Sequence, residues 1–213
     1  MNTKRILVTG FEPFGGSAMN PSQQVVERLS GDCWPGLRLQ TAILPVDGQA
    51  GPARLLQVVD DCQPDVVLCL GEASRRAVVS IERVALNLKD YRIADNAGQM
   101  VTDEPVIVGG PAAYFVTLPV RRLQAAVQSA GVPVELSLSA GAYLCNQVLY
   151  TLLHRLEGSG ALGGFVHLPA LPEQVAMGRE MMPSMSLETS LRAVAAILDA
   201  LQEMFQKDEL TRT

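Results

Sequence analysis

One cysteine and one histidine occupy positions at which side chains could carry out nucleophilic chemistry. Cys145 follows a run of small residues, 139–142, at the expected start of a helix, and His167 ends an apolar run that predicts a strand. Functional groups often lie at such element ends, and an adjacent imidazole can activate a thiol as a nucleophile. The spacing alone also fits an inert cysteine in the core, which is the commoner role of a single buried thiol.

Cys145 also lies in line with Leu149, Leu152 and Leu156 at helical spacing. Its side chain is therefore expected to point toward the sheet. A structural thiol there would be neutral, whereas a nucleophile needs its pKa lowered by an imidazole or by N–H groups at the helix start. The helix field fades after about one turn, so the residue at which the helix begins decides between these roles.

Glu82 is a third candidate because it interrupts an apolar pattern. In SIERVALNL, alternation places Glu82 on the same strand face as Val84, Leu86 and Leu88. Burying an unpaired charge is costly, so we expect protonated His167 or a nearby arginine as its partner. A salt bridge without a catalytic role is the alternative interpretation.

Phe11 and Phe14 lie in a glycine-rich turn, residues 10–16, after the first predicted strand. The turn lacks the Lys or Thr of a usual phosphate-binding loop. Two phenylalanines indicate an apolar pocket instead, or alternatively a plug at the edge of the core.

Apolar runs and helical patterns alternate along the chain. Strands are predicted at 5–9, 39–44, 66–70, 78–88, 132–138 and 164–168, and helices at 20–29, 51–61, 118–129, 141–157 and 187–205. This order predicts an α/β fold, a single-domain α/β/α sandwich with a mixed, largely parallel central sheet. Residues 87–110 are rich in turn formers, and such a long irregular stretch in a compact domain is usually functional or mobile.

Composition narrows the function classes. The chain has 213 residues, 48% hydrophobic and 18% charged, without a low-complexity linker, so residues 1–213 are expected to form one domain. A net charge of −5 and the lack of long basic runs argue against a nucleic-acid partner. The four cysteines match neither a disulfide framework nor a metal-ligand spacing, so no metal and no cofactor is expected.

Targeting signals are also not apparent. The apolar run after Lys4 and Arg5 ends too soon for an export signal, and no apolar stretch approaches the roughly 20 residues that span a bilayer. The KDEL string at 207–210 is followed by three further residues, so it cannot serve as a C-terminal retention signal. A cytoplasmic protein without a membrane partner is expected.

Five segments share their order and spacing with one known family. They are GFEPFGG (10–16), NPS (20–22), ERVALN (82–87), SAGAYLCN (139–146) and HLPALPEQ (167–174). Together they resemble pyroglutamyl peptidase I, the pyrrolidone-carboxylate peptidases, a family of cysteine peptidases. The resemblance extends from about Ile6 to about Leu201 and is far more specific than any one short motif.

The resemblance implies a mixed sheet between helical layers and an enzyme that removes N-terminal pyroglutamate from peptides. It implies Cys145 as nucleophile, His167 as general base and Glu82 as the residue that orients the imidazole. It implies that the loop of Phe11 and Phe14 holds the pyroglutamyl ring. Further substrate-binding residues implied by the motifs are Asn20, Tyr143 and Arg92, with Arg92 near the reacting carbonyl. A homo-oligomer, dimer or tetramer, is also implied.

Five positions depart from the family pattern. Tyr91 replaces a small residue, Ala94 replaces proline, Arg75 stands where glycine is usual, Leu138 stands where asparagine is common, and Asp47 falls where an apolar residue is expected. These changes bear on the shape of the pocket and on substrate tolerance.

Two other functions are compatible with the same residues. One is a nucleoside-phosphorylase-like transferase on a related fold, with Arg75, Arg76 and Arg92 as an anion site. The other is a non-catalytic binder of small molecules. Phosphate-dependent turnover would indicate the first, and an unreactive Cys145 thiol would indicate the second.

Overall fold

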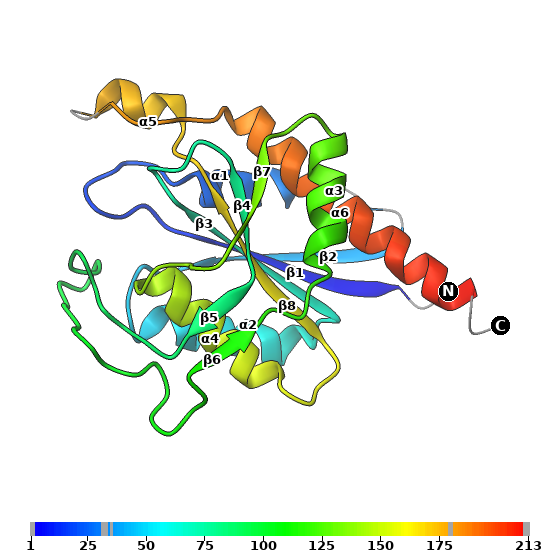
Figure 1. The fold of residues 1–213 in the computed structure, drawn as a ribbon, viewed down its shortest axis with the longest axis horizontal. Coiled ribbons are helices and arrows are strands. Elements are labelled where there is room, and N and C mark those ends of the chain that lie inside the picture. The colour runs from blue at the N-terminus through cyan, green and yellow to red at the C-terminus, as the bar shows by residue number, and fades with distance from the viewer. Residues whose placement is uncertain (1–2, 31–33, 35, 179–180, 211–213) are drawn as a thin grey trace.

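A six-stranded sheet runs through the middle of the molecule (Figure 1). The structure is a computed structural model and describes residues 3–30, 34, 36–178 and 181–210. Along the sheet the strands follow the order β2-β1-β3-β8-β4-β7. They are β1 (Lys4–Phe11), β2 (Leu37–Leu44), β3 (Val66–Glu72), β4 (Val79–Glu82), β7 (Val134–Ser137) and β8 (Leu162–Leu168). All neighbours are parallel except β4 and β8, which are antiparallel.

Helices cover both faces of this sheet (Figure 1). One layer consists of α1 (Pro21–Leu29), α3 (Val120–Ser129) and α6 (Leu187–Leu210), and the other of α2 (Ala50–Cys62) and α4 (Leu144–Leu156). The short helix α5 (Pro172–Met177) follows β8. The predicted α/β/α sandwich with a mixed, largely parallel sheet is thus confirmed.

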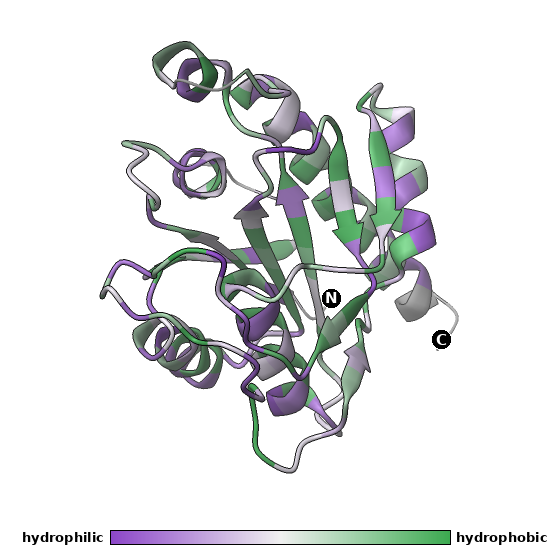
Figure 2. Cartoon of the chain, turned by 60° about the vertical axis from the view of Figure 1, so that its left-hand side comes forward, coloured by the Kyte–Doolittle hydropathy of each residue, from purple (hydrophilic) through white to green (hydrophobic). Residues whose placement is uncertain are grey.

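Strand residues alternate between two hydrophobic cores. In β1, Ile6 and Val8 pack beneath the α1/α3/α6 layer, whereas Leu7 packs beneath α2 and α4. A sheet buried on both faces needs apolar residues at successive positions, which explains the unbroken apolar runs of β1 and β3. Figure 2 shows these hydrophobic residues concentrated along the central strands.

The predicted strand 78–88 is wrong as a single element. It breaks at Arg83, whose N–H donates to Ser137 O and whose carbonyl accepts from Val116 N. The following residues form β5 (Val84–Leu86), which pairs with β6 (Ala113–Phe115) in a separate two-stranded sheet. Because the chain changes sheets there, the alternation that placed Glu82 with Val84 does not continue across Arg83.

Within β4, the observed alternation places Glu82 on the face that α4 covers. Val79 and Ile81 pack in the α1/α3/α6 core, so Ser80 and Glu82 point to the opposite face of the sheet. Phe165 and His167 of β8 share that face, because Val166 and Leu168 pack in the α1/α3/α6 core. The two polar side chains are thereby brought to one layer.

Residues 87–110 contain no helix or strand, as predicted, apart from an isolated bridge between Lys89 and Glu104. Side chains at both ends of the stretch fix its backbone. Asn87 bonds to the backbone of Ile107 and Gly110, and Asn146 of α4 bonds to the backbone of β5 and of Leu88. The stretch is therefore anchored to the helix that carries Cys145.

The sequence did not predict β6 or α5, each of which is short. Across the part of the chain that the structure describes, the helices are either too short or too polar to cross a membrane.

Candidate active site

The carboxyl ends of parallel strands meet at one edge of the sheet, where ligand sites of α/β folds usually form. There β8 brings His167 between Gly71 of β3 and Ser80 of β4. Since Ile81 pairs with Val166, Glu82 is a diagonal neighbour of His167 on the same face. The three candidates Glu82, His167 and Cys145 thus come from β4, β8 and the start of α4.

Glu82 and His167 form a buried pair. The Nδ1–H of His167 donates to Oε1 of Glu82 at 2.8 Å, because an ionised carboxylate can only accept. The side chain of His167 is 4% exposed, and that of Glu82 is 0% exposed. Nδ1 is therefore occupied, and Nε2 is the ring nitrogen that remains for other chemistry.

Arg76 is a second partner of the same carboxylate oxygen. Its Nη1 lies 2.7 Å from Oε1 of Glu82, and its Nη2 donates to the carbonyl of Ser139 at 2.8 Å. The expected partners of Glu82, a histidine or an arginine, are thus both present. Arg76 itself was not singled out for this role, and it is engaged here rather than available for an anion site.

Burial and pairing oppose one another in the pKa of Glu82. Burial raises the pKa of this carboxyl, but the hydrogen bond and charge of His167, together with Arg76, outweigh it and hold the pKa below its usual value. Burial lowers the pKa of His167, and the Glu82 charge offsets only part of that effect. The pair therefore rests as a carboxylate beside a neutral imidazole.

Cys145 is the second residue of α4, so it lies within the first helical turn. The predicted helix start at Gly141 was three residues early, and the observed start at Leu144 places Cys145 where backbone N–H groups lack helical partners. The side chain points toward β3, as predicted. A Cβ added at Gly71 would lie 3.0 Å from Sγ of Cys145 and 2.6 Å from Phe165, so only glycine fits there.

The thiol of Cys145 is protonated in the resting site. Burial raises its pKa to about 12, and the charges of Glu82 and Glu72 add to this effect. The lowered pKa expected of a nucleophile is thus not found for Cys145. A thiol in this setting needs a base to remove its proton, which a neutral His167 could do.

A cavity of about 500 Å³ opens beside Cys145 and His167. The sequence candidates Phe11, Phe14, Asn20, Tyr143 and Arg92 all line it. Phe11 is buried and packs on Phe165 at a ring separation of 6.5 Å, and Phe14 packs on Tyr143 at 6.3 Å. The aromatic rings give this cavity one apolar wall.

Asn20 contributes to the cavity mainly through the loop that it fixes. Its Oδ1 accepts from both N and Oγ of Ser22, and its Nδ2 donates to the carbonyl of Glu12. The Ser22 hydroxyl in turn accepts from Phe11 N. Asn20 therefore caps α1 and holds the phenylalanine turn in place.

Two departures from the family pattern have structural explanations. Tyr91 is buried, donates to Gln147 Oε1 and packs edge-on against Tyr143 at 4.9 Å. Asp47 accepts from the backbone N–H groups of Gln49 and Ala50 and so fixes the turn that leads into α2. Leu138 and Ala94 are exposed, and nothing in the structure explains the changes there.

Glu72 is a cavity residue that sequence reasoning did not identify. It ends β3 directly after Gly71 and lines the cavity with Cys145. Its Oε2 accepts from Gln174 Nε2 at 3.0 Å, and burial raises its pKa despite that bond. Glu72 is the last residue of the apolar strand β3, so no alternation of polar and apolar residues marked it as a site residue.

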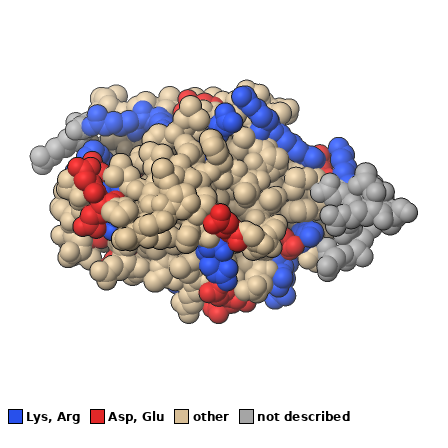
Figure 3. Space-filling model, turned by 60° about the horizontal axis from the view of Figure 1, so that its bottom comes forward, with Lys and Arg blue, Asp and Glu red and all other residues tan. Residues whose placement is uncertain are grey.

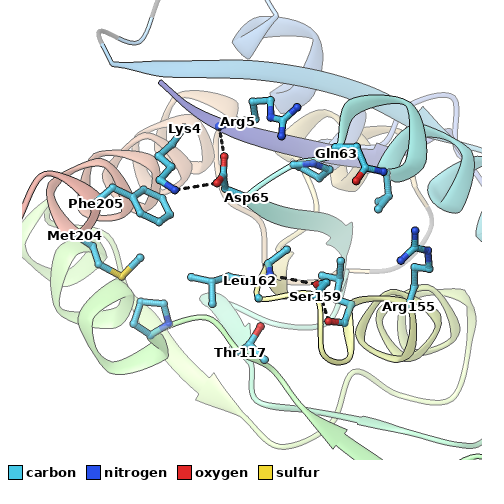
Figure 4. A pocket seen from close by; sticks show the side chains of 16 residues that line it. Lys4, Arg5, Gln63, Asp65, Thr117, Arg155, Ser159, Leu162, Met204 and Phe205 are labelled. Atoms are coloured by element: carbon cyan, nitrogen blue, oxygen red, sulfur yellow. Dashed lines mark hydrogen bonds and ion pairs between the residues drawn. The ribbon is translucent and has the colours of Figure 1, made fainter. Parts of the chain in front are cut away.

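The opposite edge of the sheet carries a different cavity, of about 650 Å³ (Figure 4). Lys4 there pairs with Asp65 at 2.9 Å, and Arg155 also lines the wall. Neither a cysteine nor a histidine lines this cavity. His154 lies on the exposed side of α4 and bonds to Tyr114 through Nδ1. The site of interest is therefore the cavity beside Cys145.

A thiol and an imidazole that line one cavity, with a carboxylate buried against the imidazole, define a cysteine hydrolase type of site. Comparison with known proteins identifies the type more closely. Residues 4–204 match the model of the family described as pyroglutamyl peptidase. The chain belongs to this family of cysteine-type peptidases.

Individual relatives agree over nearly the whole chain. A pyrrolidone-carboxylate peptidase of Vibrio vulnificus is 43% identical, covering 98% of this chain and 97% of that protein. One from Yersinia pestis is 45% identical over 93% and 94% of the two chains. The crystal structure of pyrrolidone carboxyl peptidase from Fervidobacterium islandicum superposes with a TM-score of 0.91 at 40% identity, covering 94% of this chain and 99% of that one. The resemblance carried by the five motifs is confirmed.

The half-buried Glu72 carboxyl generates a prediction about stability and pH. Its folded-state pKa is raised, so its contribution to stability is present below the pKa of the unfolded chain and is lost as pH rises through the folded pKa. Glu72→Gln should therefore unfold at a higher temperature than the parent at pH 7, and the two curves should converge near pH 4. Thermal unfolding across this pH range checks it, with exposed Glu27→Gln as the matched control. A parent that is more stable at pH 7 would contradict the assignment.

Proposed function

We propose that this protein hydrolyses the bond after an N-terminal pyroglutamyl residue through a thioester on Cys145. The observation that carries the proposal is the buried Glu82–His167 pair at 2.8 Å beside a cysteine in the first turn of α4. The family supports the substrate class. This geometry and the motif match support the roles that we propose: Cys145 as nucleophile, His167 as base and Glu82 as orienting residue.

The first step begins with a neutral Cys145 thiol and a neutral His167 imidazole. As Sγ of Cys145 attacks the carbonyl that follows the lactam ring, Nε2 of His167 takes the thiol proton. The resulting imidazolium is stabilised by the Glu82 carboxylate at Nδ1. Negative charge on the carbonyl oxygen can be met by the Cys145 N–H and its neighbour at the helix start.

The second half returns the enzyme to its resting state. The imidazolium gives its proton to the leaving amine as the C–N bond breaks, which leaves a thioester between Cys145 and the pyroglutamyl group. His167 then takes a proton from water as the water attacks the thioester, and returns a proton to the departing sulfur. The reaction needs no metal and no organic cofactor, because the thiol and the imidazole supply every step.

The cavity suits a neutral lactam. We assign the wall formed by Phe11, Phe14 and Tyr143 to the faces of the pyroglutamyl ring, with Asn20 holding the turn that carries both phenylalanines. Arg92 is exposed at the rim, where solvent screens its charge, so we assign it to substrate binding rather than to the oxyanion.

We further propose that residues 1–213 act as one domain, that the protein resides in the cytoplasm, and that it forms a homo-oligomer, either a dimer or a tetramer. Free thiols at Cys62, Cys69 and Cys145 are compatible with a reducing compartment. Cys33 lies outside the described residues. An exposed apolar face on the β5–β6 sheet supports assembly, because its side chains Leu86 and Phe115 are 36% and 70% exposed.

Substitution of the reacting groups tests the mechanism. Cys145→Ser, Cys145→Ala and His167→Ala should fold but lose turnover of a pyroglutamyl chromogenic amide by about a thousandfold or more, because the covalent route is removed. Glu82→Gln should give an intermediate loss, since it keeps the shape and loses the charge that supports an imidazolium. Steady-state kinetics and thermal unfolding of each variant are the measurements.

Matched controls exist for each residue type. Cys62→Ser and His154→Ala should stay within a few-fold of the parent, because both lie away from the cavity. The rate at which iodoacetamide alkylates Cys145 at pH 7 should fall in His167→Ala, since the protonated thiol loses its base. Full turnover in Cys145→Ala, or an essential His154, would refute the mechanism.

Ring recognition is tested with four peptides that differ only in their first residue. Peptides beginning with pyroglutamate should be cleaved, whereas glutamyl, glutaminyl and prolyl peptides bring an ammonium that an apolar wall must desolvate, at a cost of roughly a thousandfold in kcat/KM. Phe14→Ala should raise KM for the pyroglutamyl peptide and leave thiol alkylation unchanged. Comparable cleavage of all four peptides would exclude this pocket assignment.

The β5–β6 face gives a prediction about assembly. Figure 3 shows the underside of the molecule as mostly uncharged surface, interrupted by acidic and basic side chains near its middle and along its left and lower parts. The exposed side chains of Leu86 and Phe115 therefore carry the prediction. Phe115→Glu should lower the molar mass measured by light scattering, because a charge would be buried unpaired in the interface. Val108→Glu is the control, since Val108 is 89% exposed but lies in the long loop. An unchanged mass in Phe115→Glu would exclude this face.

A further inference from the structure

A second cavity adjoins the one beside Cys145. It has a volume of about 690 Å³ and shares five lining residues with the first: Phe14, Glu72, Ser74, Arg75 and Arg92. Cys145 and His167 line only the first cavity. The two cavities therefore adjoin, and the shared residues form the junction between them.

The geometry limits where a bound peptide can run. If the lactam ring occupies the wall of Phe11 and Tyr143, buried Phe11 and Leu144 close the cavity behind it. The exposed side chains of Arg75 and Arg92 mark an open side of the cavity, by which the residues after the scissile bond can leave. The second cavity lies along that path, with Ile93, Met177 and Met182 as apolar parts of its wall.

Arginine side chains stand at this junction. Arg92 and Arg75 are both exposed and line both cavities. Arg75 has interactions of its own within the protein, and the proposal is built on Arg92. Arg76 is nearby but paired with Glu82. A local positive charge on a chain of net charge −5 favours an anionic partner at this place.

Glu72 is the acidic group at the same junction, and it does not cancel the effect of Arg92. Its carboxyl is half-buried, accepts from Gln174, and has its pKa raised by burial. Arg92, by contrast, projects into solvent at the rim. An incoming acidic side chain would therefore meet the guanidinium before the half-buried carboxyl.

We propose that the second cavity is a binding site for the peptide on the leaving side of the scissile bond, and that Arg92 selects substrates with an acidic residue directly after pyroglutamate. This selectivity rests on the proposed pyroglutamyl peptidase activity and adds to it a preference beyond the ring. Because Arg92 contacts the leaving peptide rather than the reacting carbonyl, the preference should appear in KM more than in kcat.

Peptide amides of the form pyroglutamyl-X-alanine test the proposal, with X as aspartate, asparagine or lysine. Aspartate and asparagine have nearly the same shape, so their ratio isolates the charge. For an exposed ion pair, kcat/KM for aspartate should exceed that for asparagine by about two- to fivefold, with lysine lowest. The ratio should shrink when the salt concentration rises from about 20 mM to about 500 mM.

Variants of Arg92 locate the source of the preference. Arg92→Gln should bring the aspartate to asparagine ratio close to one, Arg92→Glu should invert it, and Arg92→Lys should retain part of it. Arg121→Gln removes an equal charge from an exposed position on α3, in the layer formed by α1, α3 and α6. This variant should leave the aspartate to asparagine ratio unchanged. The Arg121 control separates a local contact from the overall charge of the protein.

The outcomes separate this proposal from the one it rests on. Failure to cleave any of the three pyroglutamyl peptides would refute the peptidase function itself. Equal cleavage of the aspartyl, asparaginyl and lysyl peptides, or a preference that survives in Arg92→Gln, would overturn the Arg92 site and leave the peptidase function standing.

Discussion

The buried carboxylate of Glu82 is the constraint on which the site depends. A fully buried charge is tolerated only when it is paired and hydrogen-bonded, and one oxygen of Glu82 receives both Arg76 at 2.7 Å and His167 at 2.8 Å. Both partners must therefore be delivered to one point. The antiparallel placement of β4 beside β8 does this, because it makes Glu82 and His167 diagonal neighbours on one face.

The same burial sets the chemistry of the thiol. Removing water from around Cys145 raises its pKa, while the paired carboxylate stays ionised only because cationic and N–H groups contact it. A neutral thiol and a neutral imidazole then face the substrate, and charge separates only as the sulfur attacks. Gly71 and Phe165 complete this arrangement, since Phe165 lies 4.7 Å from the His167 ring and a side chain at Gly71 would collide with both Phe165 and Cys145.

The sequence predicted the sandwich from local signals, whereas it singled out Cys145, His167 and Glu82 together only through the five motifs of the family. Alternating apolar patterns marked the strands and helices, and only two histidines were available. The prediction that Glu82 and Val84 share one face of a single strand was wrong. Backbone hydrogen bonds of Arg83 with Ser137 and Val116, which are distant in sequence, decide where β4 ends. The positions of Glu72 and Arg76 in the site were likewise not predictable from local signals. Their hydrogen-bond partners, Gln174 and Ser139, lie far away in the sequence.

Departures from the family pattern divide according to how they are packed. Tyr91 enters a buried network in which Gln147 accepts from its hydroxyl and donates to the carbonyl of Gly48, and its ring supports Tyr143 in the cavity wall. That larger side chain therefore reinforces the wall that faces the proposed ring site. Arg75 instead lies exposed at the junction of the two cavities, so its side chain requires no rearrangement of the core. A departure at the exposed rim thus leaves the buried pair of Glu82 and His167 unaltered.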